Sequence, residues 1–165
     1  MFKKIAYSVL LILLLFVPVY LVFFIYPKKV YKINTSDYFV CEDLPFEIEN
    51  IAFENDVFCI EGWIVRRGES QKYTRYNKYV WFMDVQTEQI YSIRLNPSDQ
   101  KRRDITRYFD DGTDYRESGF SLKTTLDELE FNKEYKIYLC YQTEGNNLLS
   151  DTKYVIRNKT VEKER

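Results

Sequence analysis

The sequence predicts an all-β sandwich of about seven strands, preceded by one N-terminal transmembrane helix. Three observations support this fold class: an uncharged apolar run near the N-terminus, a series of short alternating runs after residue 45, and an aromatic fraction of 18% carried by 15 Tyr and 12 Phe. Aromatic residues favour strands over helices. Short strands at regular spacing, with no long amphipathic helix among them, are typical of a sandwich.

The chain divides into four expected segments. Residues 5–26 form a transmembrane anchor, residues 27–45 a juxtamembrane tether, residues 46–157 the β-sandwich domain, and residues 158–165 a charged tail. A chain of 165 residues has room for one domain of ordinary size and a short appendage.

The apolar run over residues 5–26 contains no charged residue. As a helix it would extend about 33 Å, close to the hydrocarbon thickness of a bilayer. A cleaved signal peptide is the alternative, but the run is long for one and no small-residue cleavage pattern follows before Pro27. We therefore expect an uncleaved single-pass anchor in the plasma membrane, with the lipid bilayer as a partner.

The orientation of the anchor depends on the lysines that flank it. Lys3 and Lys4 precede the run, and Lys28, Lys29 and Lys32 follow it. This count is nearly balanced and leans slightly against an external C-terminal domain. The sandwich character of the remaining chain nevertheless leads us to expect that this domain is extracytoplasmic.

The expected strands are short runs with apolar residues at alternate positions. They cover residues 46–53, 57–65, 78–85, 89–95, 119–125, 133–143 and 148–158. Polar residues at 86–88 and at 144–147 separate neighbouring runs and predict two hairpins.

The run that begins at residue 133 has the strongest alternation, with Tyr135, Ile137, Leu139 and Tyr141 on one face. Tyr135 also matches the corner tyrosine found where sandwich domains enter their penultimate strand. A tyrosine that is merely packed within a strand is the alternative interpretation.

Two cysteines lie in expected strands, where antibody domains place their inter-sheet disulfide. If Ile137 and Leu139 face the core, Cys140 faces away from it, and the same parity places Cys59 outward in its own strand. Outward side chains on opposite sheets are too far apart to form a disulfide. We therefore expect free thiols.

Four short motifs occur in an order that resembles a known domain family. They are Glu61-Gly62-Trp63, Arg103-Asp104-Ile105, Ser118-Gly119-Phe120, and the strand entry Asn132-x-x-Tyr135. Together they are similar to a bacterial immunoglobulin-like or fibronectin-III-like domain of membrane-anchored envelope proteins, which also occurs attached to cell-surface glycan or polyol-phosphate transferases. The resemblance covers about residues 46–157 and implies the sandwich fold. It implies no transferase activity, because the catalytic domain of those enzymes has no counterpart here.

The charged stretch over residues 102–120 is predicted to be a structural crossover between strands. Ile105 and Phe109 lie four residues apart, so one helical turn can bury both. Arg103 and Asp104 are the pair expected to tie the crossover to the edge of the sandwich, and Phe120 starts the next strand.

Two chemical interpretations of this stretch are weaker. Asp110, Asp111 and Asp114 supply only part of a calcium loop, because the distal bidentate Glu is absent at the required spacing. A pair of glycosidase carboxylates would need a cleft, which nothing in the pattern builds. We therefore expect no metal and no cofactor.

A second candidate surface is aromatic. Tyr73, Tyr76, Tyr79 and Trp81 lie in and after a long polar loop, and such side chains stack well on sugar rings. The alternative is that a row of Tyr and Trp in a strand belongs to the core.

Composition excludes several function classes. A formal net charge of -1 argues against nucleic acid as a partner, and the absence of His removes the commonest general base. The sequence also lacks a G-x-S-x-G elbow and a phosphate-binding Gly loop. We expect a non-catalytic, membrane-anchored envelope module that binds a protein or a surface glycan or other polymer. The alternative is an accessory subunit of a multi-pass membrane enzyme or transporter.

Overall fold

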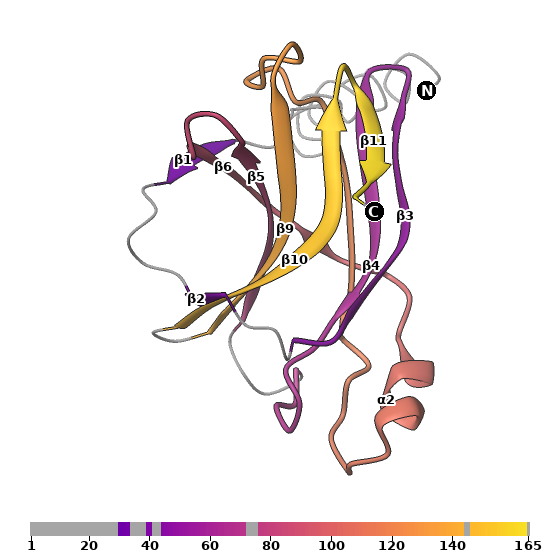
Figure 1. Cartoon of the computed structure of the whole chain (residues 1–165). Helices are drawn as coiled ribbons and strands as arrows, with labels where there is room; N and C mark the ends of the chain where they lie inside the picture. Colours follow the sequence, from indigo (N-terminus) through magenta and orange to yellow (C-terminus); the bar gives the residue numbers. More distant parts are fainter. Residues whose placement is uncertain (1–29, 34–38, 41–43, 72–75, 144–145, 165) are drawn as a thin grey trace, which may run out of the picture.

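The computed structural model describes residues 30–33, 39–40, 44–71, 76–143 and 146–164, which form two facing β-sheets and one short helix (Figure 1). The smaller sheet has the order β3-β4-β8-β7. Its strands are β3 (Phe46–Glu54), β4 (Val57–Ile64), β8 (Gly119–Thr124) and β7 (Asn96–Pro97). The all-β class predicted from the sequence is confirmed for this part of the chain.

The larger sheet has the order β1-β6-β5-β9-β10-β11. Its strands are β1 (Tyr31–Ile33), β6 (Ile90–Arg94), β5 (Asn77–Asp84), β9 (Glu134–Thr143), β10 (Asn146–Arg157) and β11 (Thr160–Lys163), and β2 (Phe39–Val40) pairs in parallel with β10. All other pairings are antiparallel, and both predicted hairpins are present, β5 with β6 and β9 with β10. The helix α2 (Arg103–Phe109) lies between β7 and β8 in the chain.

Among these residues no helix is both long and apolar enough to cross a membrane. The anchor expected at residues 5–26 lies outside the described part of the chain.

The core lies between the two sheets, because both contribute alternate side chains to it. Tyr135, Ile137, Leu139 and Tyr141 of β9 are all fully buried there, as their alternation predicted. The rings of Phe58 in β4 and Phe82 in β5 meet edge to face across the two sheets, with centroids 5.3 Å apart.

The larger sheet also buries side chains on its outer face. Trp81, Ile90, Cys140 and Leu149 form a separate apolar cluster there. Cys59 and Cys140 are free thiols that lie outside the shared core, as predicted, but both are buried rather than solvent-exposed. The outward parity was right. Cys140 is buried because it belongs to the apolar cluster on the outer face of the larger sheet, whereas Cys59 lies in β4 of the smaller sheet and is not part of that cluster.

The segments expected as a tether and a tail contribute strands. Within residues 27–45, β1 pairs with β6, β2 pairs with β10, and Leu44 is part of the core. Within residues 158–165, β11 pairs with β10. These strands are two to four residues long, which is too short for alternation to reveal them.

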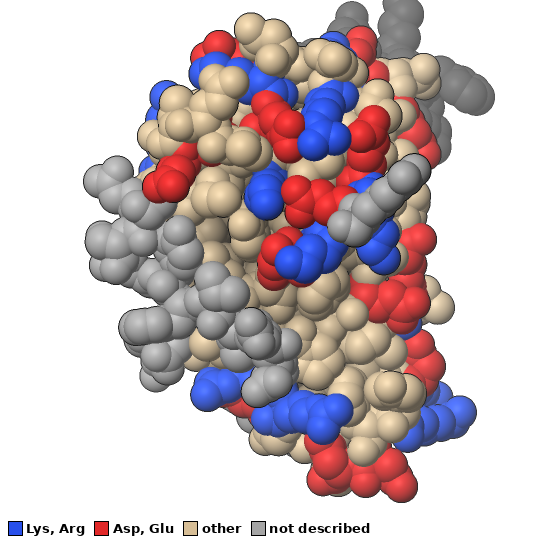
Figure 2. Space-filling view, in the orientation of Figure 1, with Lys and Arg blue, Asp and Glu red and all other residues tan. Residues whose placement is uncertain are grey.

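Positive and negative side chains are interspersed on the surface seen in Figure 2. Among the ion pairs of the described residues, Arg157 of β10 binds Glu134 of the neighbouring strand β9 at 2.8 Å. Lys159 in the turn after β10 binds Asp56 in the turn after β3 at 2.7 Å. Exposed ion pairs of this kind add little to the free energy of unfolding, and the mixed charges prevent a large patch of one electrostatic sign on the surface.

Candidate functional site

Helix α2 is held by packing rather than by helix propensity, because a seven-residue helix is too short to be stable alone. Ile105 is buried and Phe109 is half-buried, as predicted from their spacing. Asp104 in the first turn and Arg107 in the last turn both suit the helix dipole. The helix ends at Asp110, whose φ of 44° is left-handed and whose amide donates to the carbonyl of Thr106.

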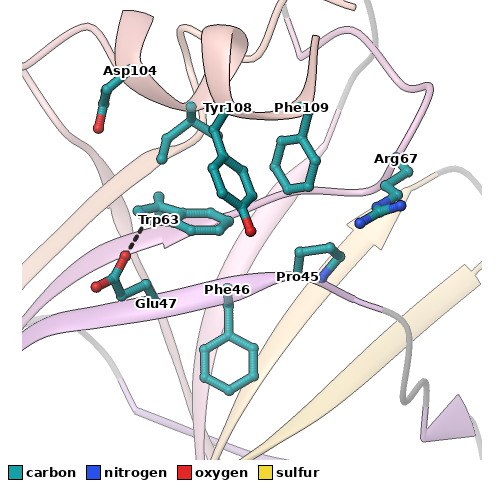
Figure 3. A pocket seen from close by; sticks show the side chains of 9 residues that line it. Pro45, Phe46, Glu47, Trp63, Arg67, Asp104, Tyr108 and Phe109 are labelled. Atoms are coloured by element: carbon teal, nitrogen blue, oxygen red, sulfur yellow. Dashed lines mark hydrogen bonds between the residues drawn. The ribbon is translucent and has the colours of Figure 1, made fainter. Parts of the chain in front are cut away.

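A groove of about 580 Å³ lies between α2, the start of β3 and the end of β4 (Figure 3). Its floor is aromatic: Trp63 is buried, and Phe109 meets it edge to face with ring centroids 6.1 Å apart. Tyr108 overhangs this floor and is 76% exposed, the largest exposure among the large apolar side chains of the described residues. Pro45 and Phe46 line the opposite side.

The Trp63 ring is fixed by a cross-strand partner. Trp63 and Glu47 face each other in the register of β4 and β3, and the indole Nε1 donates to Glu47 Oε2 at 3.1 Å. Gly62 allows the two strands to approach here, because a Cβ at this position would collide with the backbone carbonyl of Glu47. The floor of the groove is therefore preorganised.

Three charged side chains line the groove: Glu47, Arg67 and Asp104. The guanidinium of Arg67 lies 5.2 Å from the centroid of the Phe109 ring, a cation–π contact. Among the described residues, no carboxylate forms an ion pair with Arg67.

The crossover is tied to the sandwich by Arg102, not by Arg103 as the sequence predicted. The buried guanidinium of Arg102 forms ion pairs with Glu49 of β3 at 2.8 Å and with Asp104 at 2.7 Å, whereas Arg103 is exposed. The Arg102 hydrogen bond lowers the pKa of the Asp104 carboxyl below its ordinary value. The prediction failed because Arg102 lies just before the helix, with the non-helical angles φ −84° and ψ 66°. Helical periodicity places only residues within the helix, so it could not show where the Arg102 side chain points.

A second tie joins the far end of α2 to the loop after β4. The fully buried Tyr115 accepts a hydrogen bond from the amide of Gly68 at 2.8 Å and donates one to Asp111 at 2.6 Å. The amide of Tyr115 donates to Thr106 Oγ1 of α2 at 2.9 Å. The hydrogen bond from the Tyr115 hydroxyl is the main reason that the pKa of the Asp111 carboxyl lies below its ordinary value. Tyr115 therefore fixes the loop after β4 and the far end of α2 to each other, on the side of the groove that Arg67 and Phe109 line.

Two of the three aspartates that follow α2 have side-chain partners within the chain. Asp111 binds Tyr115, and Asp114 binds Arg116 at 2.6 Å. Within the described ranges no group of three acidic or cysteine side chains is arranged to hold a metal ion. Phe120, expected as part of the crossover, is a buried core residue of β8.

The predicted aromatic surface is not one surface. Tyr73 lies outside the described residues. Tyr76 stacks on the core residue Tyr141, with ring centroids 5.5 Å apart, whereas Tyr79 and Trp81 lie in the outer cluster of the larger sheet. Trp81 is only 4% exposed, so it offers no ring face to a ligand. Tyr76 packs on the core side and Trp81 is covered on the outer side of the larger sheet, so the described members of this set do not share one exposed face.

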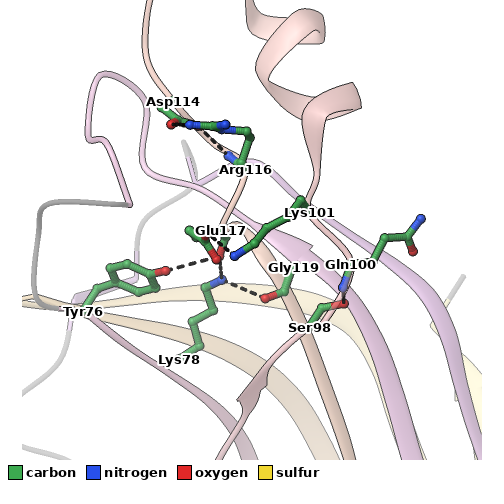
Figure 4. A network of polar contacts seen from close by, with 9 residues as sticks. All are labelled: Tyr76, Lys78, Ser98, Gln100, Lys101, Asp114, Arg116, Glu117 and Gly119. Carbon is green, nitrogen blue, oxygen red and sulfur yellow. Dashed lines mark hydrogen bonds and ion pairs between the residues drawn. The ribbon is translucent and has the colours of Figure 1, made fainter.

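Lys78 of β5, which was not identified from the sequence, is a buried residue whose ammonium group joins the larger sheet to the chain at the start of β8 (Figure 4). Its Nζ donates to the carbonyls of Glu117, Ser118 and Gly119 at 2.9, 2.6 and 3.1 Å. Burial lowers the pKa of Lys78 to about 7. The signal was present, because Lys78 has the same parity as the inward-facing Val80 and Phe82.

Tyr135 is fully buried, and its hydroxyl accepts a hydrogen bond from the amide of Glu130 at 3.0 Å. A contact of this kind, to the backbone a few residues upstream, is what a corner tyrosine makes.

Comparisons with protein-family models, with curated proteins and with solved structures found no match for this chain. The interpretation of the groove therefore depends on its own geometry.

Proposed function

We propose that this chain is a non-catalytic, membrane-anchored envelope module whose extracytoplasmic sandwich binds a protein or a cell-surface polymer through the groove beside α2. The observation that carries the proposal is Tyr108, a large aromatic side chain that is 76% exposed above an aromatic floor. Exposed aromatic residues around a concave site are typical of binding surfaces. The uncharged run over residues 5–26 supports the membrane location.

The strand order supports an immunoglobulin-like assignment of the sandwich. The order β3-β4-β8-β7 in one sheet, opposed to β6-β5-β9-β10 in the other, corresponds to strands A-B-E-D and C′-C-F-G of that fold. The hydrogen bond from Glu130 to Tyr135 at the entry to β9 agrees with the same assignment.

A binding role suits the groove better than catalysis. The described residues that line it include no Ser, Thr, Cys or Lys, so a nucleophile of those types is absent from that lining. Its two carboxylates, Glu47 and Asp104, are held by Trp63 and Arg102. Such fixed side chains preorganise a surface for recognition.

Site-specific photocrosslinking in the cells that produce the protein tests this proposal. A benzophenone amino acid placed at Tyr108 keeps an aromatic ring in the groove, and the same probe at Val85, 42% exposed in the turn after β5, is the matched control. We expect a discrete crosslinked partner from position 108 and none from position 85. Replacing residues 5–26 with an unrelated membrane helix should leave that crosslink in place. Equal crosslinking at both positions would contradict the proposal.

A further inference from the structure

The groove carries charges of both signs, which restricts the ligands that it can accept. An anionic ligand would meet the carboxylates of Glu47 and Asp104. A cationic ligand would meet Arg67, whose guanidinium already lies over the Phe109 ring, the kind of aromatic face that a cation prefers. A neutral ligand with many hydroxyl groups can satisfy all three, because hydroxyls donate to carboxylates and accept from guanidinium.

The aromatic part of the groove requires an apolar face on the same ligand. Tyr108 is held against Phe109, with ring centroids 5.1 Å apart, yet remains 76% exposed. A pyranose ring has an apolar C–H face and a rim of hydroxyls, so it can stack on Tyr108 while its hydroxyls reach the charged side chains.

An apolar peptide fits the groove less well. The carboxylates of Glu47 and Asp104 are exposed and keep lone pairs that their partners within the chain do not use. Apolar side chains would displace water from these lone pairs without offering a donor, and such desolvation is costly. The volume of about 580 Å³ suits a compact ligand. A globular partner would instead need about 800 Å² of surface on each side.

From these contacts we infer that the groove binds a neutral oligosaccharide, an inference that rests on the proposed binding function and names its ligand class. Tyr108 stacks on a sugar ring. Glu47 and Asp104 accept hydrogen bonds from sugar hydroxyls, and the guanidinium of Arg67 donates hydrogen bonds to sugar hydroxyl oxygens. Trp63, held by Glu47, fixes the floor against which the sugar lies.

Calorimetric titration of the purified full-length protein tests this inference. The probes are four neutral hexasaccharides (cellohexaose, maltohexaose, mannohexaose and chitohexaose), with the glucosamine hexamer, hexagalacturonate and an apolar hexapeptide for comparison. We expect saturable binding of at least one neutral hexasaccharide, with an affinity that hardly changes with salt because no net charge is neutralised. The charged hexamers and the peptide should bind more weakly.

Two variants with one matched control assign the contacts. Tyr108→Ala and Arg67→Leu should each weaken binding about tenfold or more, the usual effect of losing a stacking ring or a charge-assisted hydrogen bond. Arg103→Leu is the matched control for Arg67→Leu, because it removes an exposed guanidinium of α2 that does not line the groove. It should leave the affinity unchanged.

Tighter binding of a charged hexamer or of the peptide would overturn the inference, as would an equal loss in the Arg67 and Arg103 variants. If position 108 forms its crosslink in cells and no neutral hexasaccharide binds, the proposed function stands and the ligand class is wrong. If position 108 forms no crosslink, the proposed function itself fails.

Discussion

The amide of Gly68 donates a 2.8 Å hydrogen bond to the hydroxyl of Tyr115, a residue 47 positions further along the chain. Tyr115 is fully buried and also donates to Asp111, so one hydroxyl holds the loop after β4 and the loop after α2. These loops flank the groove on the side of Arg67 and Phe109. The shape of the candidate site therefore depends on a polar contact beneath it.

Tyr115→Phe should lower the free energy of unfolding by about 1–2 kcal/mol, because it removes two hydrogen bonds and keeps the ring. Urea denaturation measures this change. Hydrogen exchange should also show faster exchange of the Gly68 amide. Tyr108→Phe is the control, since its hydroxyl is exposed, and it should leave both quantities unchanged.

Asp111→Asn should lower the melting temperature, whereas Asp110→Asn should not. Asp111 accepts hydrogen bonds from the Tyr115 hydroxyl and the Thr113 amide, while Asp110 has a left-handed backbone that Asn tolerates equally well. Calcium should leave the melting temperature of the parent protein unmoved, since a ligand that binds only the native state must raise it. A rise with calcium that the Asp111 variant loses would refute a purely structural role for this stretch.

Phe120→Ala should cost about 3–5 kcal/mol of stability, the usual effect of truncating a buried Phe. Phe120 is 1% exposed and packs in the shared core, so no solvent can relieve the resulting cavity. Denaturant unfolding gives the value, and a loss below about 1 kcal/mol would contradict the placement of this side chain.

Between pH 7 and about 8.5 the stability should rise with pH because of Lys78. Its pKa is about 7 in the folded protein, below the value of about 10.4 expected in the unfolded chain. The unfolded state therefore binds more protons in this window, and the slope from this residue is at most about 1.4 kcal/mol per pH unit. Cys140, whose pKa burial raises to about 12, contributes the opposite slope at higher pH.

Lys78→Met should abolish that rise, although it also lowers stability at every pH by leaving three carbonyls without their donor. Lys101→Met is the matched control, because Lys101 is exposed and its ion pair with Glu117 lies at the surface. A parent protein whose stability is flat from pH 7 to about 8.5 would show that Lys78 remains charged when folded.

Alternation within single strands was enough to predict the core of β9 and the pairing of both hairpins, because these features depend on neighbours in sequence. The same parity would have found Lys78 and separated Tyr76 from the outer cluster. Parity could not reveal that Trp81 is covered, since that depends on other strands of the sheet. Strands of two to four residues carry no periodic signal at all.

The groove could not be predicted from the sequence because it combines three distant segments. The three segments meet only after the sandwich forms: residues 45–47, the pair Trp63 and Arg67, and residues 104–109 of the helix. The spacing of Ile105 and Phe109 did predict the helical turn, but it did not single out Tyr108 as the exposed aromatic residue. It could not distinguish Arg102 from Arg103 as the tie, because that choice depends on where the helix begins.

Oxidation footprinting of the parent protein tests most directly whether the groove is the binding surface, and it can be carried out whatever the ligand is. Hydroxyl radicals modify exposed side chains, so Tyr108 should react readily in the purified protein, where it is 76% exposed. In intact cells we predict strong protection of Tyr108, while Val85, 42% exposed away from the groove, reacts as it does in the purified protein. Equal oxidation of Tyr108 in cells and in the purified protein would contradict the account.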